Sequence, residues 1–198
     1  MGGDQALPGK TRSDTPAFLR ISSQGNRGSG LSSELEEWID LSQPDFRPVF
    51  SFHPQGHEDR LGSGINRDIH ATASPRIVGG IETISVQLEI GYSVLDTNVD
   101  RANYRATYER KPRQKDFTLR DVKSGLVGSS TIPNKEFEQL VDLDSGPTNE
   151  QLLIYAMPGL KTLASGRNEE AKDELSRVLA QCKDTLEKRA LLDLLTKP

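Results

Sequence analysis

Cysteine, histidine and long apolar runs are all scarce in this sequence. Cys182 is the only cysteine among the 198 residues, which excludes an intramolecular disulfide and any zinc site built from several thiolates. No stretch approaches the roughly 20 consecutive apolar residues of a membrane helix, so we expect no membrane span. The composition fits a soluble protein of the cytoplasm and equally an exported protein whose signal has been removed.

Known catalytic motifs are also lacking. The sequence contains no Gly-x-Ser-x-Gly elbow, and the glycine-rich Gly25–Gly30 segment lacks the Lys-Ser or Lys-Thr ending of a phosphate-binding loop. Cys182 falls on an apolar helical stripe, so we expect a buried packing side chain and not a nucleophile. The sequence therefore favours a non-catalytic binding or protein-interaction module without a cofactor, whose partner is a protein or a small ligand.

Residues 84–94 show the clearest strand pattern. Apolar side chains occupy every second position, and polar or small residues fill the positions between them. The apolar set is Ile84, Val86, Leu88, Ile90, Tyr92 and Val94. This period of two predicts a strand of an antiparallel sheet with one buried face. Because the segment is longer than the usual strand of about five or six residues, we expect a strongly twisted or curved sheet.

Weaker strand patterns flank this segment, with turn-forming glycine, asparagine, aspartate and proline between them. They cover residues 17–22, 48–52, 104–110 and 117–122. No helical pattern separates these segments, so they predict a meander of about five to seven strands.

Residues 31–41 fit two structures. A helix is favoured by a Ser33–Glu36 capping box and by the helical spacing of four apolar residues, which are Leu31, Leu35, Trp38 and Ile39. The same segment contains Glu37–Leu41, which also fits a strand, and the preceding glycine-rich loop suits a hairpin. The two interpretations are nearly balanced, with the strand slightly favoured.

From Pro133 onward the apolar spacing changes to about 3.6 residues, the period of an amphipathic helix. Helices are predicted over residues 135–141, 150–157, 171–182 and 186–195. Asn134 and Thr148 are expected as N-caps, Pro158–Gly159 as a break, and the last two helices as a hairpin.

The predicted fold is therefore α+β: a curved antiparallel meander followed by a C-terminal helical part packed on it. We divide the chain into a mobile N-terminal tail over residues 1–16, a sheet part over 17–130 and a helical part over 131–198. The tail is assigned because its few apolar side chains cannot offset the entropy of ordering it. The sheet and the helices are expected to form one compact unit.

All three histidines fall within eighteen residues, between Phe52 and Ala71. Two imidazoles and a carboxylate suit a zinc or non-haem iron centre, and the candidate ligands are His53, His57, Glu58 and His70. Pro54 and Gly56 prevent a helix from placing the first two histidines on one face, so a loop would have to bring them together. A metal-dependent enzyme is thus the second hypothesis, and we expect no tightly bound zinc or iron.

Positive charge is concentrated in residues 101–123, which contain eight basic and three acidic residues although the whole chain has a net charge of −4. Tyr104, Tyr108 and Phe117 are interleaved with these charges, as in surfaces that stack bases. Polyanion or nucleic-acid binding is the third hypothesis, and its candidate residues are Arg105, Arg110, Arg113 and Lys115. The acidic net charge argues against nucleic acid.

Overall fold

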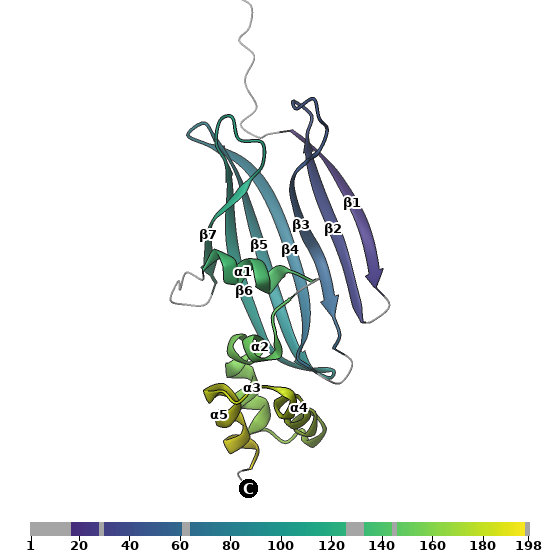
Figure 1. Ribbon diagram of the computed structural model, residues 1–198, viewed down its shortest axis with the longest axis vertical. Helices are drawn as coiled ribbons and strands as arrows, with labels where there is room; N and C mark the ends of the chain where they lie inside the picture. Colours follow the sequence, from purple (N-terminus) through teal and green to yellow (C-terminus); the bar gives the residue numbers. More distant parts are fainter. Residues whose placement is uncertain (1–16, 28–29, 61–63, 126–132, 144–145, 197–198) are drawn as a thin grey trace, which may run out of the picture.

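The computed structural model describes residues 17–27, 30–60, 64–125, 133–143 and 146–196. Within these ranges, seven strands form one sheet in which each strand pairs with the next along the chain, and five helices follow (Figure 1). The strands are β1 (Phe18–Arg27), β2 (Leu31–Asp40), β3 (Pro48–Glu58), β4 (Asn66–Val78), β5 (Ile81–Val94), β6 (Thr97–Arg110) and β7 (Thr118–Ser124). The helices are α1 (Asn134–Val141), α2 (Asn149–Tyr155), α3 (Met157–Ala164), α4 (Glu169–Gln181) and α5 (Leu186–Leu195).

The predicted α+β fold is confirmed: an antiparallel meander is followed by helices that pack on it. The segment predicted as a mobile tail, residues 1–16, lies outside the described residues. No helix in the described part of the chain is both long and apolar enough to cross a membrane.

Strand β5 lies in the middle of the sheet and has the alternation that its sequence predicts. From Ile84 to Val94, every second side chain is buried, and the positions between them are half-buried or exposed. The strand pairs along its length with β4 on one side and β6 on the other. One face of the sheet therefore carries the hydrophobic core, and the other faces solvent.

Residues 31–40 form strand β2, so the slightly favoured interpretation is the correct one. The strand is paired on both sides, with β1 and β3. Glu36 does not cap a helix; its carboxylate accepts a hydrogen bond from the indole Nε1 of Trp38, two residues further along the strand (2.5 Å). The apparent helical spacing arises because neighbouring Trp38 and Ile39 are both buried although they point to opposite faces of the strand.

Strand β4 was not predicted, and residues 53–58, expected to form a loop, belong to strand β3. Period-two alternation is present in β4, but small or weakly apolar residues such as Ala71, Ala73 and Pro75 provide much of its inner face. The stronger signal is the two-residue turn Gly79–Gly80, where both φ angles are positive (57° and 79°). This backbone is typical of the tightest hairpin turns, which strongly favour glycine and require a strand on each side.

The sheet curls strongly towards its core face at the end that contains the β2–β3 and β6–β7 turns. In a flat sheet, strands six positions apart would be separated by about 29 Å, at about 4.8 Å per strand. Here the ring of Phe18 on β1 lies 6.0 Å from that of Phe117, next to β7. The amide of Phe117 also donates to the carbonyl oxygen of Val49 on β3 (3.1 Å). The core face is therefore concave.

A buried ion-pair network fastens this curled end. Arg110 of β6 is almost fully buried and donates to Asp40 at the end of β2 (2.6 Å) and to Glu82 of β5. Burial alone would raise the pKa of Asp40, but hydrogen bonds from Ser42 and Arg110 outweigh it and lower that pKa.

The pH dependence of stability should report this network. Because the pKa of Asp40 is lower in the fold than in the unfolded chain (about 3.9), its ionised form stabilises the fold above about pH 4. That stabilisation is lost as the pH falls through the folded value. We expect Asp40→Asn to lower the free energy of unfolding by about 1–2 kcal/mol at neutral pH, with the difference shrinking towards pH ~2. Urea unfolding across this range measures it, and a pH-independent difference would contradict the assignment.

Strands β3 and β4 pair over only a short stretch. Residues 55–58 of β3 face residues 67–70 of β4, and beyond His70 the described residues of β4 pair with β5 alone. Pro54 stands at the point where the two strands separate, and Pro75 lies in the half of β4 that has a free edge. Proline has no N–H to donate, so both positions suit an unpaired strand edge. We call this opening the β3–β4 split.

Helix α1 lies across the concave face (Figure 1) and is held at both ends by side chains. At its start, the side-chain Nδ2 of Asn134 donates to the carbonyl oxygens of Leu119 (3.2 Å) and Arg120 (3.4 Å) on β7. Asn134 is therefore the first helical residue and not the N-cap, a position that Pro133 occupies without a side-chain hydrogen bond. At the other end of α1, Arg67 of β4 donates to the carbonyl oxygen of Leu140.

Helices α2 to α5 gather at one end of the sheet (Figure 1). Thr148 caps α2 with a capping box, as expected, and α3 begins at Met157 with proline in its first turn. Gly159 of α3 lies against the main chain of β6, where an added Cβ would come within 1.6 Å of the carbonyl oxygen of Val99. The predicted burial of Cys182 is confirmed. Its thiol donates a hydrogen bond to the carbonyl oxygen of Val178, and burial raises the pKa of the thiol.

Candidate functional site

A cavity of about 330 Å³ lies between the concave face and α1, next to the β3–β4 split. We call it the inner cavity. Most of its walls are apolar, and four polar side chains also line it. The main apolar residues are Phe52, Ile69, Val86, Leu88, Phe137 and Val141. The polar ones are Ser51, His53, Glu138 and Asp142. Pockets that hold small molecules are typically apolar clefts of about 300–1,000 Å³ with a few polar groups. The lining of the inner cavity fits this class, and its volume is near the lower limit.

Three elements position these walls. Strand β5 presents Val86 and Leu88 because its alternation places them on the core face. Helix α1 covers them from the other side with Phe137, whose ring lies 6.1 Å from that of Tyr104 on β6. Since β3 turns away from β4 after the short paired stretch, no strand fills the space between them. The split therefore leaves a void that the tightly packed middle of the sheet lacks.

The small side chain of Ala71 lies on the β4 side of the inner cavity. Strand alternation places it on the core face with Ile69, whereas its neighbour Thr72 is exposed on the opposite face. A larger residue at position 71 would occupy the cavity directly. Position 71 is therefore the place at which the cavity can be filled by a single substitution.

The polar lining residues give the inner cavity a negative electrostatic character. Tyr108 lines it, and the pKa of this phenol is raised to about 12, first by burial and second by the nearby charge of Glu138. The imidazole Nδ1 of His53 is 3.0 Å from the carbonyl oxygen of Glu34. A carbonyl oxygen only accepts, so Nδ1 carries the hydrogen of this bond and Nε2 of the neutral ring remains an acceptor.

The structure does not bring the four candidate metal ligands together. His53 lines the inner cavity, whereas His57 and His70 are exposed on the opposite face of the sheet. His57 pairs there with Asp68 of the neighbouring strand (Nδ1 to Oδ1, 2.7 Å). Glu58 points to the core face, where it pairs with Arg67 (2.7 Å). Among the described residues, no group of three His, Cys, Asp or Glu side chains is placed to hold a metal ion.

The four basic candidates are also dispersed. Arg110 is buried in the ion-pair network at the curled end, and Lys115 lies 3.8 Å from Asp45 in an exposed ion pair. Arg113 lies in the β6–β7 turn with a positive φ of 75°. Only Arg105 projects from the exposed face of the sheet.

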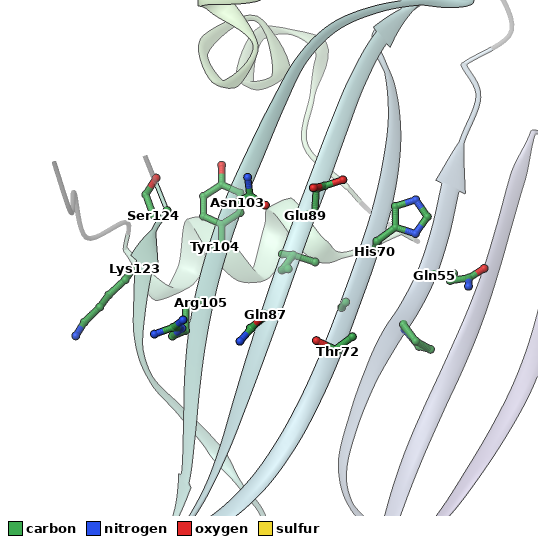
Figure 2. Close-up of a pocket in the computed structure, with 14 residues that line it drawn as sticks. Gln55, His70, Thr72, Gln87, Glu89, Asn103, Tyr104, Arg105, Lys123 and Ser124 are labelled. Atoms are coloured by element: carbon green, nitrogen blue, oxygen red, sulfur yellow. The ribbon is translucent and has the colours of Figure 1, made fainter. Parts of the chain in front are cut away.

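The exposed face of the sheet carries a second hollow, of about 690 Å³, which we call the outer groove (Figure 2). Two rows of polar side chains run across it, each built from residues that are direct cross-strand neighbours. One row contains Gln55, His70, Glu89 and Asn103. The other contains Thr72, Gln87, Arg105 and Lys123. The groove is wide and open, which is the usual condition of the solvated face of an antiparallel sheet.

Electrostatics within the outer groove are mixed. Glu89 forms an exposed ion pair with Arg101 (3.2 Å), and Arg105 stands directly opposite Lys123, a like-charge neighbour that costs stability. The groove therefore offers no single charge to a partner, and its apolar lining stays open to solvent. The inner cavity is the more enclosed of these two hollows, so it can remove more of a bound molecule's surface from water.

Comparison of the chain with protein-family models, with curated proteins and with solved structures finds no match to any of them. Conclusions about function therefore depend on the geometry alone.

The inner cavity was missed by the sequence-based reasoning. The apolar residues that line it are ordinary core residues by pattern, and Glu138 fits the solvated face of an amphipathic helix. One signal was available: Pro54, in a run of β-prone residues, marks a place where strand pairing stops. Where strand pairing stops in a curved sheet, the strands separate, and a void between them is expected.

Proposed function

We propose that this protein is a non-catalytic binding module that holds a small, mainly apolar molecule in the inner cavity. The observation that carries the proposal is the combination of an apolar void of about 330 Å³ with a lateral opening at the β3–β4 split. Burying apolar ligand surface there contributes about 25 cal/mol for each Å² removed from water. The hypotheses of a metal-dependent enzyme and of polyanion binding receive less support, because their candidate residues are dispersed.

Neutral, environment-sensitive dyes test the proposal. We expect N-phenylnaphthylamine to bind the wild-type protein saturably with increased fluorescence, and Ala71→Leu to weaken this binding about tenfold or more because the new side chain fills the cavity. Thr72→Leu is the matched control, since it adds an apolar side chain to the same strand on the opposite face. Saturable binding that survives Ala71→Leu unchanged, or no binding by wild type, would contradict the proposal.

A further inference from the structure

The polar groups at the inner cavity share one chemical property: they accept hydrogen bonds. Glu138 presents an exposed carboxylate, for which no ion-pair partner is found among the described residues. Asp142 follows one helical turn later and adds a second carboxylate to the lining. In the neutral tautomer that donates Nδ1–H to the carbonyl oxygen of Glu34, Nε2 of His53 is a further acceptor.

No lysine or arginine is among the described residues that line the inner cavity. The guanidinium of Arg67, at the C-terminal end of α1, is occupied by Glu58 and by the carbonyl oxygens of Leu140 and Asp142. The pKa of the Tyr108 phenol is raised first by burial and then by the charge of Glu138, which opposes a second negative charge beside it. An anionic head group would therefore meet repulsion, whereas a cation would find an unneutralised carboxylate.

We propose that the ligand of the inner cavity is an amphipathic amine, with its apolar part buried between β5 and α1 and its protonated amino group beside Glu138. This inference depends on the proposed function, and it specifies the chemical class of the ligand. The amino group donates to the carboxylate of Glu138 and to Nε2 of His53, which satisfies both acceptors without a protein cation. A fatty acid fits the same apolar walls but places its carboxylate next to that of Glu138.

Three molecules with the same chain and different head groups separate these possibilities: octylamine, octanol and octanoate. At neutral pH the amine is protonated and the carboxylate is ionised, as for lysine and glutamate side chains. Each is titrated against wild-type protein loaded with N-phenylnaphthylamine, and its displacement of the dye is measured. We expect octylamine to displace the dye at about tenfold lower concentration than octanoate, with octanol between them.

Substitutions on α1 then assign the preference to one residue. Glu138→Gln should weaken octylamine binding about fivefold and leave octanol unchanged, because only the charged partner is lost. Glu138→Lys should reverse the order of octylamine and octanoate. Glu136→Gln is the matched control, since it removes an exposed charge from the same helix outside the cavity lining. Thermal unfolding of each variant confirms that it is folded.

The outcomes distinguish the two proposals. If neither the dye nor any of the three molecules binds, the proposed function itself fails. If all three displace the dye equally, or if octanoate is the strongest, the inner cavity binds apolar ligands but the assignment of an amine is wrong. An octylamine preference that persists in Glu138→Gln would also overturn the assignment, because it would show that another group provides the selectivity.

Discussion

A chain that ends before Pro133 should fail to form a stable monomer. Without α1 and the helices that follow it, the concave face of the sheet would expose core residues such as Leu88, Ile90, Tyr92 and Tyr104 to water. Contiguous apolar surface of this size drives association, and seven long strands offer edges for it. We expect the shortened chain to be aggregated in size-exclusion chromatography or unfolded by circular dichroism.

The matched control is a chain that ends at Thr196, which retains every described helix. It should behave like the full-length protein. A soluble, monomeric fragment with a cooperative unfolding transition and only strand content would show that the sheet is an independent domain, and would refute the expectation.

Replacing Arg67 by alanine should lower the free energy of unfolding by about 3–5 kcal/mol, a large part of the stability of an ordinary domain. The side chain is fully buried and donates to Glu58 (2.7 Å) and to the main-chain oxygens of Leu140 and Asp142. Burial lowers the pKa of Arg67, although arginine keeps its proton at neutral pH. Its removal leaves a carboxylate and two carbonyl groups without their donor.

Urea unfolding measures this loss, and Arg76→Ala on the same strand is the control. Arg76 is exposed, so its substitution should change the free energy of unfolding by no more than about 0.5 kcal/mol. Arg67→Lys keeps the charge but cannot reach three acceptors in the same geometry, and an intermediate loss is expected. Equal stabilities of Arg67→Ala and Arg76→Ala would show that the hydrogen bonds of Arg67 contribute nothing to stability. Hydrogen exchange of the α1 amides should accelerate in Arg67→Ala, because one anchor of that helix is lost.

The parts of the fold that follow from local patterns could be predicted from the sequence. The alternation over residues 84–94 specified a half-buried strand. The helical spacing of apolar residues over 171–182, among them Leu175 and Leu179, specified a helix that buries one face. Strand β4 was not predicted, because Ala71 and Ala73 give a weak apolar signal and an internal proline argues against a strand. The double-glycine turn Gly79–Gly80 was the sequence feature that indicated a hairpin, and so a strand before it.

The candidate site could not be predicted, because it depends on contacts between residues far apart in the sequence. Arg110 belonged to a basic segment by composition, yet its partner Asp40 lies 70 residues earlier and makes it a buried structural group. Glu138 has a role only because α1 lies across a sheet that has opened between β3 and β4. The spacing of residues within one segment does not predict the pairing of Arg110 with Asp40 or the position of α1 on the sheet.

The meander has a consequence for the order in which the chain folds during synthesis. Each strand pairs with its immediate successor, so every hairpin can form as soon as its second strand is available, with little loop-closure entropy to overcome. The contacts that curl the sheet, between Phe18 and Phe117 and between Asp40 and Arg110, join the first strands to the last. Folding on the ribosome should therefore proceed hairpin by hairpin, and the ring of Phe18 should become protected from solvent only after Phe117 has been synthesised.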